Sequence, residues 1–145
     1  MKWIAFVVVG LIALIAAIAG VGSMLPRSHK ASRMLRVKRP PADVWPVMMQ
    51  VTQASDVPVD VLDSQPPHRL VTRVTEKEKN FGGTWTIDIA SIGDGATVTI
   101  AEDGWVANPI FRFVSRVIIG HHATMDGILK QVARAFDEEA VLTGE

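Results

Sequence analysis

The chain begins with a long apolar stretch and continues in shorter segments where apolar and polar positions alternate. Residues 3–21 carry no charged or strongly polar side chain. A helix of that length, at about 1.5 Å per residue, spans roughly 28 Å, close to the bilayer hydrocarbon thickness of about 30 Å. The pattern therefore predicts an N-terminal transmembrane helix, and the remainder of the chain has the size of one domain.

The segment after the span alternates between apolar and polar positions and then changes period. Residues 30–38 predict a strand in which Arg33, Leu35 and Val37 share one face. From Pro41 onward apolar residues recur every three or four positions, which predicts a helix that has a proline in its first turn.

Two hairpins and a final helix follow. Alternation over residues 59–64 and 69–74, and again over 84–89 and 96–102, predicts four strands with turns rich in proline or glycine. Near the end, apolar residues at helical spacing predict a long amphipathic C-terminal helix with one buried stripe. That stripe consists of Met125, Ile128, Leu129, Val132 and Phe136.

The order of these elements predicts an α+β fold. A curved antiparallel sheet would pack on the long C-terminal helix, with a cavity or groove between them. We expect residues 1–23 to form the anchor, residues 24–29 a linker and residues 30–145 the folded domain.

The apolar stretch also has features of a secretory signal peptide. Lys2 supplies a short positive region, and Ala17-Ile18-Ala19 matches an A-x-A cleavage pattern. The stretch is longer than the usual 7 to 15 residues of the apolar region within a signal peptide, which favours a retained single-pass anchor. Six basic residues follow the span and one precedes it, so the domain is expected on the cytoplasmic side. The alternative is a secreted or periplasmic protein after cleavage.

Composition and charge exclude several function classes. The chain has no cysteine, which rules out disulfides, iron–sulfur clusters, thiolate zinc sites and cysteine nucleophiles. The formal net charge is zero, but the chain from Pro40 onward carries 8 basic and 15 acidic side chains. An acidic body argues against nucleic acid as a partner. The basic stretch before it, residues 27–39, suits anionic lipid headgroups.

Several motifs resemble a known superfamily. Residues 30–45 (KASRMLRVKRPPADVW) resemble the first strand and helix of the SRPBCC superfamily, also called the START-like or Bet v 1-like fold. QPPHRLVTRV at 65–74 resembles its "PPxRLV" strand. GGTW, Glu102-Asp103-Gly104 and NPIFRF, with Gly120 before the last helix, resemble bacterial members of the polyketide cyclase/dehydrase and lipid transport group. The resemblance implies a helix-grip fold around a hydrophobic ligand site.

The chain departs from this superfamily in one place. Typical members have another hairpin between the first helices and the "PPxRLV" strand, whereas only residues 51–62 lie there in this chain. We therefore expect a sheet that lacks one hairpin and has an exposed edge. Such an edge invites pairing with a second copy of the chain.

Chemically active constellations are sparse. The adjacent His121 and His122 would project about 100° apart on a helix, so we expect no metal site there. Glu102 or Asp126 could form an acid–base pair with one of these histidines. Arg112 is expected in a buried Arg–carboxylate pair or at an anionic ligand head. We find no phosphate-binding loop or catalytic triad and expect no cofactor.

Two function classes remain, and a structural or partner-binding role is a third. The first is a noncatalytic, membrane-tethered module that binds a hydrophobic or amphiphilic small molecule or a membrane lipid, with a long apolar part in the groove. The second is a small cyclase- or dehydratase-type enzyme in which Glu102 or His122 moves a proton. In either case the residues expected to line the ligand site are Trp85, Ile87, Trp105, Phe111, Arg112, Arg116, His122, Met125 and Leu129.

Overall fold

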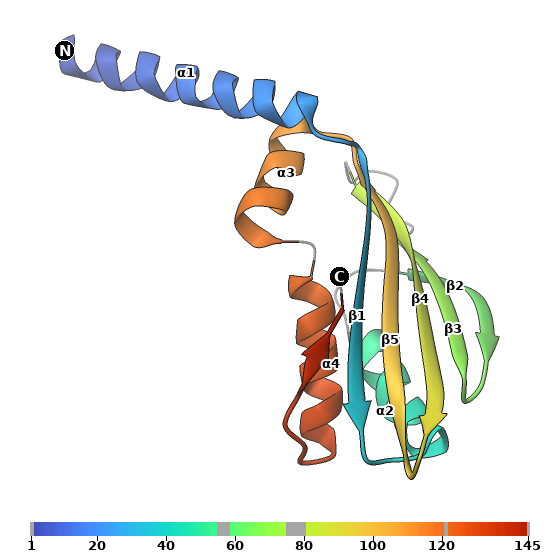
Figure 1. Ribbon diagram of the computed structural model, residues 1–145. Coiled ribbons are helices and arrows are strands. Elements are labelled where there is room, and N and C mark those ends of the chain that lie inside the picture. The colour runs from blue at the N-terminus through green and yellow to red at the C-terminus, as the bar shows by residue number, and fades with distance from the viewer. Residues whose placement is uncertain (1, 55–58, 75–80, 121, 145) are drawn as a thin grey trace.

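The structure is a computed structural model that describes residues 2–54, 59–74, 81–120 and 122–144. Within these residues the chain forms a six-stranded antiparallel sheet of order β2-β3-β4-β5-β1-β6 with helices against it (Figure 1). The strands are β1 (Ser28–Val37), β2 (Val59–Gln65), β3 (Arg69–Val74), β4 (Phe81–Ile92), β5 (Gly95–Val106) and β6 (Leu142–Thr143). The helical elements are α1 (Lys2–Met24), α2 (Pro41–Gln53), α3 (Pro109–Phe113), the π-helical η1 (Val114–Ile119) and α4 (Ala123–Ala135).

The predicted α+β class and its antiparallel sheet are confirmed. All five predicted strands are present, and β6 is an addition that pairs with β1 at Leu35 and Met34. A two-residue strand has no alternation of its own to reveal it. Its position depends on the neighbouring strand, which offers an unpaired edge.

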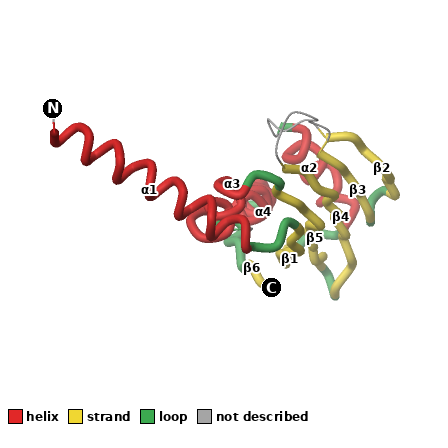
Figure 2. The backbone as a smooth tube through the Cα atoms, turned by 90° about the horizontal axis from the view of Figure 1, so that it is seen from above, coloured by secondary structure: helices red, strands yellow, loops and turns green. Residues whose placement is uncertain are grey.

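A single hydrophobic core lies between one face of the sheet and two helices. Inward positions of the central strands pair directly, Ile87 with Ile100 and Ile89 with Val98, and all four side chains are buried. Buried residues of α2 and α4 belong to the same cluster, so both helices cover the same face of the sheet. Figure 2 shows the strands curving around α2.

The helices cover only part of the length of the strands. β4 and β5 have 12 residues each, which is about 40 Å at about 3.3 Å per residue. α2 and α4 have 13 residues each, which is about 20 Å. The prediction of a long C-terminal helix is therefore not confirmed. α4 buries four residues of the predicted stripe, whereas the fifth, Phe136, lies just after the helix and is half-buried.

The end of α4 is fastened to the turn between β1 and α2. The Glu138 carboxylate accepts hydrogen bonds from the backbone N–H of Lys38 at 3.0 and 3.1 Å. The Arg39 guanidinium lies 5.8 Å from the centre of the Phe136 ring. These contacts hold the acidic end of the helix at the end of the sheet farthest from α1 (Figure 1).

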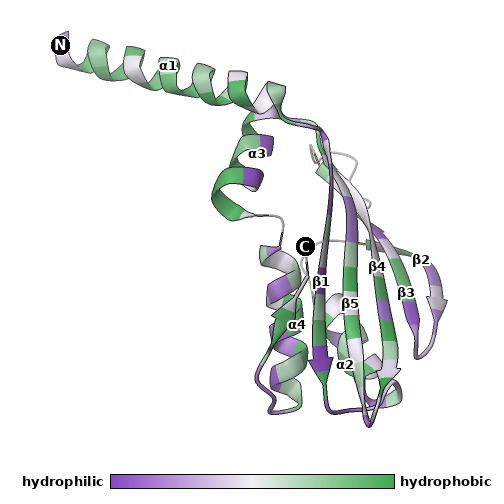
Figure 3. Ribbon diagram, in the orientation of Figure 1, coloured by the Kyte–Doolittle hydropathy of each residue, from purple (hydrophilic) through white to green (hydrophobic). Residues whose placement is uncertain are grey.

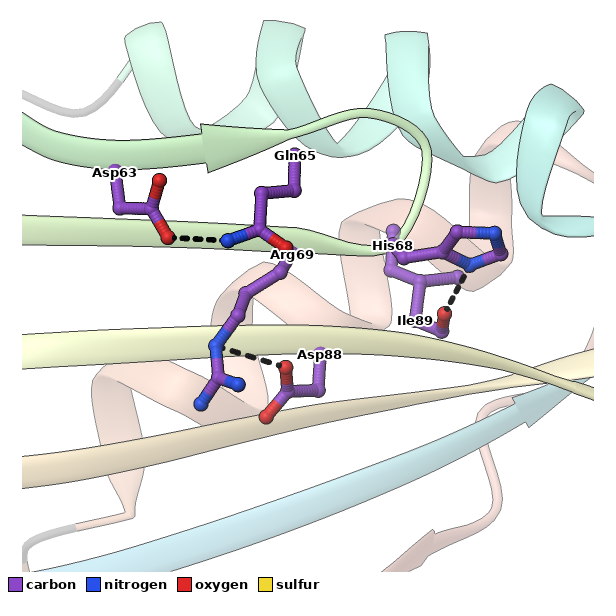
Figure 4. A network of polar contacts seen from close by, with 6 residues as sticks. All are labelled: Asp63, Gln65, His68, Arg69, Asp88 and Ile89. Carbon is purple, nitrogen blue, oxygen red and sulfur yellow. Dashed lines mark hydrogen bonds and ion pairs between the residues drawn. The ribbon is translucent and has the colours of Figure 1, made fainter.

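The hairpin of β2 and β3 is held to β4 by its turn (Figure 4). The carbonyl oxygen of His68 accepts a 2.8 Å hydrogen bond from the Ile89 N–H, and the ring Nδ1 of His68 lies 3.1 Å from the Ile89 carbonyl oxygen. Arg69 and Asp88, which are opposite each other in the register, form an ion pair at 3.4 Å. Both side chains of this pair are about half exposed, so the pair contributes little to stability.

β2 is an edge strand on which no other strand pairs beyond β3 within the described part of the chain. Val61 and Leu62 are exposed there. The strand is bulged between Val61 and Asp63, and a bulge and carboxylates such as Asp60 oppose edge-to-edge pairing. Pairing of this edge with a second copy stays a prediction.

α1 projects away from the domain (Figure 1). It is long and apolar enough to cross a membrane by length and composition, properties that a signal sequence shares. None of its most apolar window is buried within the structure, and Gly22 is its buried residue.

We predict that Leu129→Ala lowers the free energy of unfolding by about 2–5 kcal/mol, because it opens a cavity at a side chain with no exposed surface. Urea unfolding of the full chain in mild detergent, followed by tryptophan fluorescence, measures the change. Leu14→Ala is the matched control, since the same atoms are removed from a side chain of α1 that is 56% exposed. Equal midpoints for Leu129→Ala and the wild type would contradict the core described above.

Candidate ligand-binding site

A pocket of about 150 Å³ lies where the inner face of the sheet extends past the two helices. It is bounded by β2 to β5, by the last turn of α2 and by the first turn of α4. Apolar side chains and three threonines line most of it, and one carboxylate faces it. The lining residues are Thr52, Val59, Thr72, Val74, Phe81, Gly82, Gly83, Trp85, Glu102, Thr124 and Ile128.

The register of the sheet explains why these residues meet. Trp85 of β4 lies opposite Glu102 of β5 and Thr72 of β3, all on the face that carries the core. Gly83 pairs with Gly104, two residues farther along each strand and on the same face. A Cβ at Gly83 would lie 2.9 Å from the Asp103 carbonyl oxygen, so the two strands approach too closely there for a side chain.

The carboxylate of Glu102 is paired inside the fold. Its Oε1 lies 3.6 Å from Nε2 of His29, and both side chains are less than one fifth exposed. Gly104 makes this pair possible, because a Cβ there would lie 2.6 Å from the His29 ring. The pocket is therefore lined by one carboxylate, Glu102, which forms an ion pair with the side chain of His29.

A second ion pair joins β1 to α4. Nε of Arg33 lies 2.9 Å from Oδ1 of Asp126, with both side chains about one quarter exposed. The approach is close, but its angle falls outside hydrogen-bond geometry. Glu102 thus pairs with His29 and Asp126 with Arg33, and neither ion pair includes His122, which the sequence allowed as an acid–base partner.

One of the nine residues expected at the ligand site lines this pocket, and it is Trp85. Ile87, Met125 and Leu129 have no exposed surface and belong to the core. The structure therefore fills with side chains the part of the groove that these residues were expected to line. The pocket lies beyond them, toward the α1 end of the strands.

Four of the other expected residues lie elsewhere. Trp105 is on the opposite face of the sheet, where it covers Gly82 and stays 46% exposed. Phe111 and Arg116 are exposed on α3 and η1. His122 is half-buried at the start of α4, and its Nδ1 has no hydrogen-bond partner among the described residues.

Arg112 is buried at the junction of α1, β5 and α3, away from the pocket. Instead of the expected carboxylate, its guanidinium meets main-chain carbonyl oxygens. Nε donates to Val106 at 3.0 Å, one terminal nitrogen donates to Gly22 and Leu25 at 3.0 Å each, and the other donates to Ala107 at 2.7 Å. This arginine ties the end of α1 to the folded domain.

Sequence reasoning overlooked most of the pocket. The threonines at 52, 72 and 124 come from three elements and have no shared spacing that would reveal them. The strand alternation did contain a usable signal. Glu102 is two residues from the buried Ile100 and is therefore expected on the same face of the strand, whereas Trp105 is five residues away and is expected on the opposite face. No group of three or more metal-binding side chains occurs among the described residues, and His121 lies outside them.

No protein-family model and no curated protein match the sequence. Solved structures do match. A conserved protein from Geobacillus kaustophilus aligns with TM-score 0.61 at 12% identity over 79% of this chain and 99% of that chain. The HSP90 activator PFC0360w from Plasmodium falciparum aligns with TM-score 0.52 at 9% identity, over 80% of this chain and 100% of that chain.

DynU16, a protein of the dynemicin biosynthetic locus, aligns with TM-score 0.50 at 13% identity over 78% of this chain. This chain spans 48% of the length of DynU16. At such low identities these likenesses show the fold alone. They are consistent with a fold of the helix-grip type, which the sequence resemblance implied.

We predict that Arg112→Met loosens the junction between α1 and the domain. Each buried carbonyl left without its donor costs about 1–3 kcal/mol, so the junction should open at least about ten times more often. The rate of tryptic cleavage after Arg27, in the full chain in mild detergent, measures this opening. Arg116→Met, which removes an exposed arginine of the same segment, is the control and should leave the rate unchanged. An unchanged rate in Arg112→Met would show that its hydrogen bonds do not hold the junction.

Proposed function

We propose that this protein is a noncatalytic, membrane-tethered module that binds a small hydrophobic or amphiphilic molecule. The observation that carries the proposal is the pocket, whose walls are largely apolar and whose polar groups are few and converge. Ligand sites commonly combine apolar walls with a few placed polar groups. The occurrence of DynU16 in a biosynthetic locus is compatible with a small-molecule site in this fold.

The tether in this proposal is α1. Its 23 residues give a helix of about 35 Å, which exceeds the hydrocarbon thickness of about 30 Å. The hydrogen bonds of Arg112 to Gly22 and Leu25 support a fixed rather than a flexible attachment. We place the domain on the cytoplasmic side, as the basic residues after the span favour.

The pocket lies at the end of the sheet that is nearest to α1. Phe81, which lines the pocket, is opposite Val106 in the register. The N–H of Val106 donates to the carbonyl oxygen of Arg27 at 2.8 Å, three residues after α1 ends. A molecule that leaves the bilayer beside α1 would therefore have a short path to the pocket.

The size of the pocket restricts the ligand. A volume of about 150 Å³ is below the roughly 300–1,000 Å³ of sites for drug-sized molecules, and it matches a cavity that holds one benzene ring. The buried part of the ligand should thus be an aromatic ring or a short acyl end. Hydroxyl groups of the ligand would form hydrogen bonds with the Glu102 carboxylate and the threonine side chains.

Phenol tests this site, because it combines one ring with one hydroxyl group. We predict that phenol saturably shifts the δ1-methyl NMR resonance of Ile128 in the full chain, reconstituted in lipid nanodiscs. Thr124→Trp should fill the pocket from the exposed first turn of α4 and weaken binding at least about tenfold, a loss of about 1.4 kcal/mol.

Lys130→Trp is the matched control for this substitution, since it adds the same ring to an exposed position of α4 outside the pocket. It also corrects for phenol that dissolves in the lipid. Equal binding by Thr124→Trp and Lys130→Trp would refute the site, and so would the lack of any saturable shift.

A second candidate function is proton transfer in the same pocket. It is favoured by the Glu102 carboxylate at the pocket wall, whose Oε1 lies 3.6 Å from Nε2 of His29, since carboxylates and histidines are the side chains that most often serve as general acids or bases. The sequence suggested Glu102 or His122 for this role. Glu102 is the better candidate, because it lines the pocket and has His29 beside it, whereas His122 does not line the pocket.

Glu102→Gln separates the two candidates. For a binding module we expect wild type and Glu102→Gln, purified in nanodiscs, to carry copurified small molecules of the same mass. For a dehydratase- or cyclase-type enzyme, the variant would retain substrate and the wild type product, so the masses found by mass spectrometry would differ. A mass difference of that kind would overturn the noncatalytic proposal.

A further inference from the structure

The segment formed by α3 and η1 exposes an apolar surface. Five of its large apolar side chains are between 38% and 69% exposed. The described residues leave each of them at least 38% exposed. They are Ile110, Phe111, Val117, Ile118 and Ile119.

This surface is fixed to the end of α1. Gly22 packs so closely on the Pro109 carbonyl group that no side chain would fit between them. Arg112, in the same segment, donates to the carbonyl oxygens of Gly22 and Leu25. The position of α1 therefore determines where α3 and η1 lie.

The length of α1 places this contact at the boundary of a bilayer. If α1 crosses the membrane, as the proposed function holds, a hydrocarbon layer of about 30 Å accommodates about 20 residues of helix. Counted from Trp3, these residues end at Gly22, the residue that touches α3. The apolar surface then begins where hydrocarbon gives way to headgroups.

The orientation of the segment suits this boundary. Figures 1 and 2 show that α3 and η1 run crosswise to α1, so they would lie along the membrane plane when α1 crosses it. In Figure 3 the strongly hydrophobic part of the segment faces away from the sheet. This is the same side on which α1 extends from the domain. Helical segments that lie in a membrane interface bury such an apolar side among the lipids.

The charges of the segment agree with a lipid surface. Residues 109–120 contain two arginines and no acidic residue, although the chain from Pro40 onward is acidic. Arg112 is used inside the fold, whereas Arg116 is exposed beside the apolar side chains. An exposed arginine at this depth can contact anionic headgroups.

We propose that α3 and η1 form a second membrane contact, which lies in the interface of the bilayer that α1 crosses. The inference rests on the proposed tether. It adds that the domain contacts the lipid surface through α3 and η1, in addition to its attachment through α1. The domain, and with it the pocket, is then held in one orientation to the membrane.

Spin labels on single cysteines test the proposal, since the natural chain has no cysteine. The full chain is reconstituted in vesicles of phosphatidylcholine and phosphatidylglycerol and labelled at Ile118→Cys, Val141→Cys or Ala13→Cys. Ile118 and Val141 are matched, at 69% and 66% exposed, but Val141 lies outside the segment. Collisions of each label with oxygen, which dissolves in lipid, are compared with collisions with a water-soluble nickel chelate.

We expect the oxygen-to-nickel ratio at position 118 to exceed that at 141 severalfold, and position 13 to show the highest ratio. A lipid-like ratio at 13 with a water-like ratio at 118 would overturn the interfacial contact and leave the tether intact. Water-like ratios at both positions would overturn the tether and the contact together. Protection at 118 from both oxygen and nickel would identify a second protein copy as the cover, and would also overturn the proposal.

Discussion

The sheet has one face to cover and two short helices with which to cover it. β4 and β5 extend about 40 Å, whereas α2 and α4 each extend about 20 Å. The half of the inner face beneath the helices is a packed core that includes Leu35, Ile87 and Val98. The other half has no helix over it along its full width, so its residues must meet a different physical requirement.

That requirement explains the change of residue type along the same strands. Past Ile87 and Ile100, the inward positions become Trp85 with Glu102 and then Gly83 with Gly104. Charged groups in this region are paired, as burial demands. The glycines allow the strands and His29 to come close together. The pocket is what remains between these residues and the ends of α2 and α4.

The remaining helical segment, α3 with η1, is used differently. Gly120, with a φ of 79°, separates it from α4, so the two do not form one long helix across the sheet. Asn108 caps α3 through the N–H groups of Ile110 and Phe111, and Arg112 joins the segment to the end of α1. The division of the C-terminal helical region thus shortens α4 beside the pocket and leaves α3 next to α1.

The sequence by itself determined five of the six strands, their faces, and the helices other than α3 and η1. Apolar residues at period two and at helical spacing identify the sheet, α2 and the buried stripe of α4, because each pattern reflects burial of one side. The same local signal identifies α1 as long and apolar. The alternation also places Trp85 and Glu102 on the inner face of the sheet. It places Trp105 on the outer face, although we had assigned Trp105 to the ligand site.

Only the tertiary structure decided which buried positions are filled and which border a space. Ile87 and Leu129 resemble pocket residues in sequence, but packing between sheet and helices leaves them no surface. The partners of Arg112 could not be predicted, because carbonyl oxygens carry no sequence signal and those of Gly22 and Leu25 are far from it along the chain. The pairing of Glu102 with His29 likewise depends on the register between β1 and β5, which no single segment specifies.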